Sequence, residues 1–142
     1  MKKLVLVLTM LLAFACSSLA FAADGGDLNK EQKTAEKMMT SLEADAAASY
    51  AALAPTLSAD LNKALGEKNF AAIQSQVKKQ FGSLKETKFH SFERFDQGDR
   101  VTYIAAFSKE NVVIMTFMFG KDAKLQNFSP YKAPEKAPAE KK

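Results

Sequence analysis

The sequence predicts an α+β domain in which N-terminal helices pack on a four-stranded antiparallel sheet. Three observations predict it. Apolar residues in the first half of the chain recur at helical intervals. From Lys85 onward, apolar and polar residues alternate, as they do in strands that bury one face. Short clusters of turn residues separate four such segments, and connections this short join antiparallel neighbours.

The chain begins with a segment typical of a secretory signal peptide. Lys2 and Lys3 precede an apolar run over Leu4–Ala15. This run is shorter than the ~20 residues that a membrane-spanning helix needs, and it fits the apolar part of a cleaved signal. Ala22 and Ala20, one and three places before Ala23, are small, which favours cleavage before Ala23. We therefore expect a periplasmic or secreted protein without a membrane span.

Cys16 leaves a second interpretation open. It follows Ala13-Phe14-Ala15 and precedes two serines, which resembles the cysteine box of a bacterial lipoprotein. That box prefers leucine three places before the cysteine, whereas Leu12 lies four places before it. We favour simple cleavage and keep lipidation of Cys16, which would anchor the chain to the envelope, as the alternative. Cleavage before Ala23 leaves no cysteine, which excludes disulfides and thiolate catalysis.

The predicted chain organisation is a signal peptide over 1–22, one domain over 23–131 and a tail over 132–142. About 120 residues after cleavage are enough for one self-sufficient core. The tail is rich in Lys, Ala and Pro, which predicts disorder. The formal net charge of +4 comes from the signal and the tail, because basic and acidic residues are equal in number over 23–131. A neutral exported domain is not expected to bind nucleic acid.

The expected helices are bounded by proline, glycine and capping residues. Pro55 ends the first, because the residue before a proline avoids the helical region. Gly66 ends the second and Gly82 the third, and Asn69 is expected to cap the start of the third. The expected helices span 28–54, 58–65 and 70–81.

The second half of the chain predicts the strands. Their expected ranges are Lys85–Phe95, Arg100–Ser108, Val112–Phe119 and Lys124–Ser129. In the second strand, the residues expected to face the core are Val101, Tyr103, Ala105 and Phe107. In the first strand, Phe89, Phe92 and Phe95 are three residues apart, so either both faces are covered or a bulge bends the strand.

Helices followed by such a meander resemble the cone-shaped α+β fold of the nuclear transport factor two and cystatin-like superfamily. The nearest likeness is to small exported bacterial domains of unknown function in that group. It covers Leu57 to Phe128, including Phe92-Glu93-Arg94-Phe95 before the strand Val101–Phe107 and a final hairpin over Phe117–Phe128. The resemblance implies this fold and a pocket between sheet and helices. It implies no reaction, because the fold hosts enzymes, binding modules and dimerisation units.

The residues that could carry chemistry are few. His90 is the only histidine, so we predict no histidine-based metal site. A general base near Tyr103 or Glu93 is one interpretation of His90, and a histidine on the strand surface is the one we favour. Phosphate-binding glycine loops, serine nucleophile elbows and zinc-type spacings are absent from the sequence, and we predict no cofactor.

The segment Val112–Phe119 is apolar at seven of eight positions, which predicts burial of both its faces. One layer of helices covers only one face of a sheet. The second face therefore meets a further helix, a partner subunit or an apolar ligand. The alternative is a central strand whose second face is only weakly covered. We therefore predict a non-enzymatic domain that binds a small apolar ligand or a protein partner, including a second copy, through the sheet. The alternative is a pocket enzyme of the same fold. The residues expected at the binding surface are Phe92, Tyr103, Ile114 and Met118.

Intact-mass measurement of the protein recovered from the envelope or the medium tests the expected processing. The mass should correspond to a chain that begins at Ala23, because the small residues before it suit signal cleavage. A diacylated or triacylated chain that begins at Cys16 would instead establish the lipoprotein.

Overall fold

The computed structural model describes residues 27–134. Residues 27–30 belong with the segment before them, and 31–134 carry the domain described below. The expected cleavage point, Cys16 and the tail after 134 lie outside the described residues. No helix in the described part of the chain is long and apolar enough to cross a membrane.

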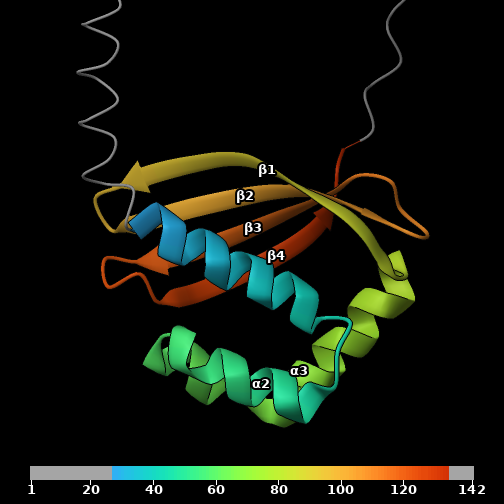
Figure 1. The fold of residues 1–142 in the computed structure, drawn as a ribbon, viewed down its shortest axis with the longest axis horizontal. Coiled ribbons are helices and arrows are strands. Elements are labelled where there is room, and N and C mark those ends of the chain that lie inside the picture. Colours follow the sequence, from blue (N-terminus) through green and yellow to red (C-terminus); the bar gives the residue numbers. More distant parts are fainter. Residues whose placement is uncertain (1–26, 135–142) are drawn as a thin grey trace, which may run out of the picture. The chain divides into compact units, whose positions relative to one another are not determined.

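Four antiparallel strands form one sheet in their order along the chain, as predicted (Figure 1). They are β1 (Leu84–Phe95), β2 (Gly98–Phe107), β3 (Val113–Gly120) and β4 (Leu125–Lys132). The largest difference from the predicted bounds is at the end of β4, which continues past Pro130. Since β4 is an edge strand, a proline there need not break a ladder of hydrogen bonds. The helices and this sheet make an α+β fold.

The prediction of a single helix up to Pro55 is wrong. The helix that covers 31–41 ends there, and α2 (Ala46–Leu53) follows after a turn. Asp45 caps α2, because its carboxylate accepts a hydrogen bond from the backbone N–H three residues further on, at 3.1 Å. The Gln74 side chain donates to two carbonyl oxygens at the break, at 2.6 and 2.9 Å. These bonds satisfy backbone groups that the break leaves unpaired.

A short 3-10 turn, η1 (Ala54–Thr56), leads to the long helix α3 (Ala59–Phe81). Ser58 caps α3 by accepting a hydrogen bond from a backbone N–H of its first turn at 3.2 Å. Gly82 ends α3 as predicted, with a φ of 85°. A side chain at this position would also meet the Ser108 hydroxyl at 2.0 Å, so glycine is required there on both grounds.

Gly66 interrupts α3, where a helix end was predicted. Its φ of 61° and ψ of 167° are non-helical, and the two halves of α3 meet at a kink there. The prediction that the second half starts with Asn69 as its cap is wrong. Helical geometry resumes directly after the glycine, and the Asn69 side chain donates to the Ala64 carbonyl at 3.0 Å.

A bulge in β1 decides which way its phenylalanines point. The register of β1 against β2 shifts between Phe89 and Ser91, so His90 is the additional residue. Phe89 pairs with Tyr103 and Phe92 with Val101, which places both rings on the face that carries the core. The bulge is one of the two predicted alternatives. Strict alternation would place His90 and Phe92 on one face, and the bulge separates them.

An aromatic row crosses the inner face of the sheet, which is the face that the helices cover. Neighbouring ring centroids lie 5.7, 6.3 and 6.5 Å apart along the row, within the range of favourable ring pairs. The row contains one ring from each strand: Phe89, Tyr103, Phe117 and Phe128. Met38, Met39 and Leu42, at the end of the first helix, belong to the same buried cluster. The predicted inward residues of β2 are all buried.

Truncation of Phe117 to alanine tests this core. The side chain is fully buried between two other rings of the row, so Phe117→Ala should lower the free energy of unfolding by ~3–5 kcal/mol. Denaturant unfolding measures the loss. Thr116→Ala, one residue away on the other face, is the control and should cost far less. Equal costs for the two variants would contradict the assignment of faces.

Candidate functional site

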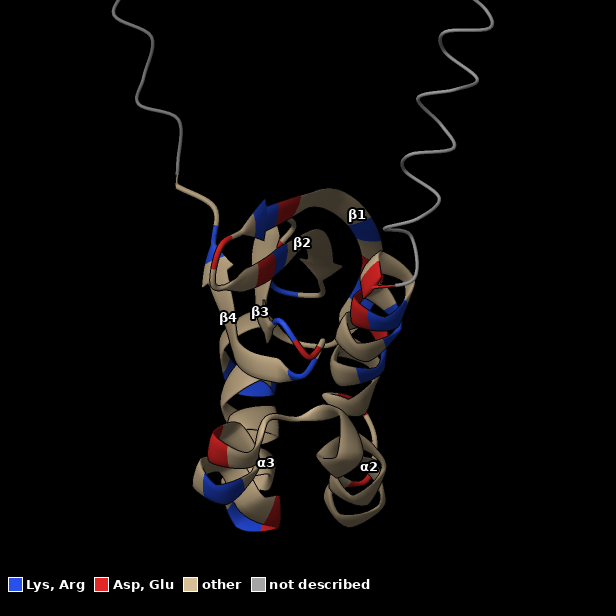
Figure 2. Cartoon of the chain, turned by 90° about the vertical axis from the view of Figure 1, so that its left-hand side faces the viewer, with Lys and Arg blue, Asp and Glu red and all other residues tan. Residues whose placement is uncertain are grey.

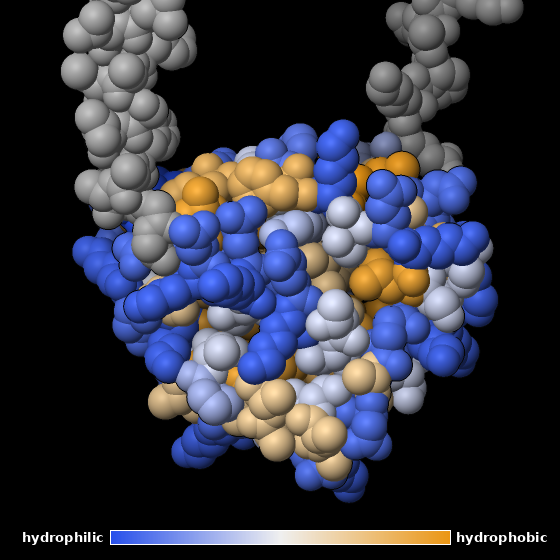
Figure 3. Space-filling view, in the orientation of Figure 1, coloured by the Kyte–Doolittle hydropathy of each residue, from blue (hydrophilic) through white to orange (hydrophobic). Residues whose placement is uncertain are grey.

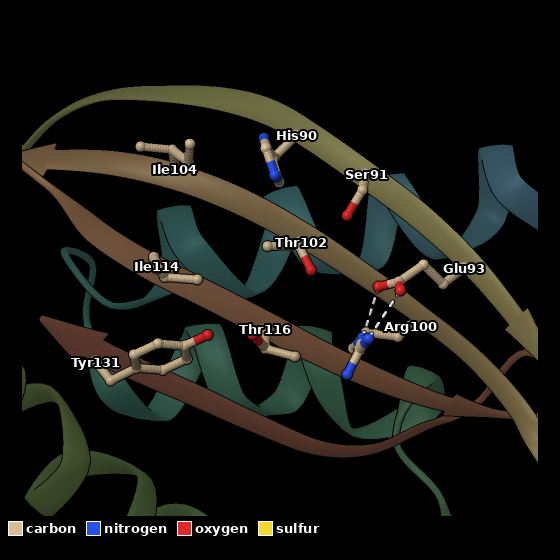
Figure 4. A pocket seen from close by; sticks show the side chains of 9 residues that line it. All are labelled: His90, Ser91, Glu93, Arg100, Thr102, Ile104, Ile114, Thr116 and Tyr131. Carbon is tan, nitrogen blue, oxygen red and sulfur yellow. Dashed lines mark hydrogen bonds and ion pairs between the residues drawn. The ribbon is translucent and has the colours of Figure 1, made fainter. Parts of the chain in front are cut away.

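A hollow lies on the outer face of the sheet, which is the face opposite the helices. Its volume is about 470 Å³, within the range of ligand pockets, but it is broad and open and extends over all four strands. Figure 4 looks onto this face with the helices behind it. The lining residues are His90, Ser91, Glu93, Arg100, Thr102, Ile104, Ile114, Thr116 and Tyr131.

Alternation along the strands brings these side chains together. Ile114 of β3 pairs with Ile104 of β2 on one side and with Tyr131 of β4 on the other. These side chains are at least partly exposed, with Tyr131 at 44 %. None of them belongs to the core cluster behind the sheet. They form an apolar patch in the hollow.

Glu93 and Arg100 form a two-pronged ion pair at the edge of the hollow. The Arg100 guanidinium donates from Nε at 2.7 Å and from Nη2 at 2.8 Å to the two carboxylate oxygens, and Figure 4 shows the paired heads between β1 and β2. The hydrogen bonds from Arg100 hold the pKa of the Glu93 carboxyl below its ordinary value. Glu93 therefore stays ionised at neutral pH, and both its oxygens accept from Arg100. This arrangement does not suit a general acid or base.

Arg100 also belongs to a second hollow, so the two hollows adjoin. The second hollow has a volume of about 390 Å³, and Phe95 and Met118 line it. Phe95 is 46 % exposed, and the Arg100 guanidinium lies over its ring at 5.2 Å from the centroid. Together the two hollows form one continuous surface along the sheet, on which apolar and polar side chains are mixed.

The residues predicted at the binding surface divide between the two faces. Ile114 and Met118 lie on the outer face, half-buried. Phe92 packs on the core from the inner face, and Tyr103 is only 3 % exposed there. The four therefore do not form one site. Residues 1–26, which include Cys16, are not described.

Tyr103 is a core residue whose hydroxyl has polar neighbours. Its hydroxyl donates to the Glu36 carboxylate at 3.0 Å. Burial, followed by the hydrogen bond to Glu36, raises the pKa of Tyr103 to about 12. His90 lines the outer hollow and lies on the other side of the sheet from Tyr103, so these two do not form an acid–base pair. Glu93, the other neighbour that the sequence left open for His90, lines the same hollow.

Several residues of the hollow were not predicted. Tyr131 lies beyond the predicted end of the last strand at Ser129, whereas β4 continues to Lys132. Ser91 reaches the outer face only through the bulge at His90. Thr102 and Thr116, in contrast, follow from strand alternation, since each lies between two inward residues.

A groove of about 280 Å³ opens between α3 and β4, on the helix side of the sheet. Leu61, Ile73 and Phe128 are among its apolar walls, and the side chains of Gln76 and Gln80 also line it. Among residues 27–134, no ionisable side chain lines this groove. On the helix side, Figure 3 shows hydrophilic residues over most of the surface, with hydrophobic patches between them.

Charged residues of both signs are interspersed over the domain (Figure 2). Among residues 27–134, no group of three or more His, Cys, Asp or Glu side chains is placed to hold a metal ion. Comparisons of the chain with protein-family models, curated proteins and solved structures gave no match. The resemblance to the nuclear transport factor two and cystatin-like superfamily therefore stays a prediction.

The raised pKa of Tyr103 predicts a loss of stability at alkaline pH. The folded-state pKa of about 12 lies above the ordinary value of about 10, so the stability linked to this group is complete below about pH 10. It is lost as the pH rises through 12. Denaturant unfolding at a series of alkaline pH values should show this loss in the native chain and a smaller loss in Tyr103→Phe. The same loss in both would show that Tyr103 is not responsible.

Proposed function

We propose that this chain is an exported, non-catalytic binding module that holds a protein partner against the outer face of its sheet. One observation carries the proposal. Ile104, Ile114 and Met118 stand half-exposed on a face that the core does not include, around a hollow that extends over four strands. Contiguous apolar surface of this kind marks interaction sites.

The shape of the hollow favours a protein over a small ligand. Pockets for small molecules enclose most of the ligand surface. Here the apolar side chains are spread along an open face, and the adjoining hollow at Phe95 continues it. Such a surface suits a partner that itself presents a broad, complementary face.

Two features favour binding over acid–base catalysis. The only carboxylate that lines the outer hollow is Glu93, and its lowered pKa and its pairing with Arg100 remove it from proton transfer. The apolar groove between α3 and β4 offers no ionisable side chain to a substrate. His90 also lines the outer hollow, but it stands on an open face that would not enclose a small substrate.

Native mass spectrometry of the protein recovered from the cells that produce it tests the proposal. The native chain should carry a protein partner and so exceed the mass of one chain. Ile114→Lys should remove the partner, because a charge would be buried without a counter-ion, while circular dichroism shows an unchanged fold.

Thr87→Lys is the matched control. It places the same charge on an exposed residue of β1, paired with the buried Ala105 and thus on the inner side of the sheet. The control should keep its partner. A native chain that always has the mass of one chain, or an Ile114→Lys variant that keeps its partner, would refute the proposed function.

A further inference from the structure

The outer face is ordered in rows that cross the strands. The first row contains the apolar side chains of Ile104, Ile114 and Tyr131, which are paired in register, and it ends in Lys88 of β1, which pairs with Ile104. The hydroxyl row contains one hydroxyl from each strand, Ser91, Thr102, Thr116 and Ser129, and these are also paired in register. The ionic row contains Glu93, Arg100, Met118 and Asn127.

Each row is complementary to a copy of itself. Aliphatic side chains pack on aliphatic side chains. A hydroxyl both donates and accepts, so a row of hydroxyls can pair with an identical row, which a row of carboxylates or ammonium groups cannot do. Within residues 31–134, none of the four hydroxyls makes a side-chain hydrogen bond. Ser91 and Thr116 are half-buried, Ser129 is exposed and Thr102 is only 9 % exposed, so the row can meet another molecule mainly through Ser91, Thr116 and Ser129.

The ionic row does not oppose such pairing. Glu93 and Arg100 neutralise each other within one chain through two short hydrogen bonds. The other two members of the row, Met118 and Asn127, are uncharged. Two copies of this row carry no net charge and do not repel each other.

The face approaches the size of a standard dimer interface. Four strands about 4.8 Å apart and about eight residues long, at roughly 3.4 Å per residue, give a face of roughly 500 Å² in projection. Side-chain relief raises the accessible area toward the ~800 Å² per partner of a standard interface.

We propose that the partner is a second copy of this chain, an inference that rests on the proposed function. The two copies are related by a two-fold axis that runs parallel to the strands, between β2 and β3. This axis lays β2 of one copy over β3 of the other and keeps every row opposite the same row. Ile104 then faces Ile114 of the other copy, and Thr102 faces Thr116. The interface is isologous and closes at two chains.

Sedimentation equilibrium of the purified chain over a concentration series tests the arrangement. The native chain should have twice the mass of a single chain. Ile104→Lys and Ile114→Asp should each have the mass of one chain, because a charge would face an isoleucine of the other copy. An equimolar mixture of the two variants should recover the mass of two chains, because the new lysine and aspartate then face each other.

Thr87→Lys is again the control and should remain dimeric. Thr116→Arg is a second disruptive variant at a half-buried hydroxyl and should be monomeric with a native circular dichroism spectrum. Three results would overturn the inference: a monomeric native chain, dimeric single isoleucine variants, or a mixture that stays monomeric. A monomeric native chain that binds a different protein in cells, and loses it in Ile114→Lys, would leave the proposed function standing without the dimer.

Discussion

One row of aromatic rings on the inner face determines which side chains of the sheet point inward and which point outward. The row contains Phe89, Tyr103, Phe117 and Phe128. Each strand contributes one ring, and the row lies under the helices. Tyr103 and Phe117 are buried, Phe128 is half-buried and Phe89 at the edge is 40 % exposed. Because side chains alternate along a strand, turning this row inward sends the neighbours of each ring to the outer face. A slip of one residue in any strand would expose a ring and bury a polar neighbour, so the row specifies the register.

The bulge at His90 makes the row compatible with the sequence of β1. Without it, Phe89 and Phe92 would point to opposite faces, since they are three residues apart. With it, both rings join the core side, while Ser91 and Glu93 reach the outer face. One additional residue therefore positions both the edge of the core and one wall of the candidate site.

The two faces differ in the kind of groups they present. The inner face is closed by large apolar side chains, and its buried hydroxyl at Tyr103 has a carboxylate partner in Glu36. The outer face mixes half-exposed isoleucines, unpaired hydroxyls and an ion pair whose charges cancel. A face of this mixed composition can be exposed to water. Its apolar side chains are nevertheless removed from water when a partner covers them, which favours binding.

Local patterns in the sequence predict the helix-then-meander order, the interruption at Gly66, the end of α3 at Gly82, and the division of β3 into Phe117 and Ile114 faces. These follow from local rules, because a glycine conformation or a two-residue alternation needs no distant partner. The break before α2 is held partly by Gln74, which lies far along the chain, so the first helix was predicted too long. The separation of Tyr103 and Phe92 from Ile114 and Met118 also depended on tertiary structure. Only the pairing of β1 with β2 places the bulge, and only the pairing of four strands brings four hydroxyls into one row.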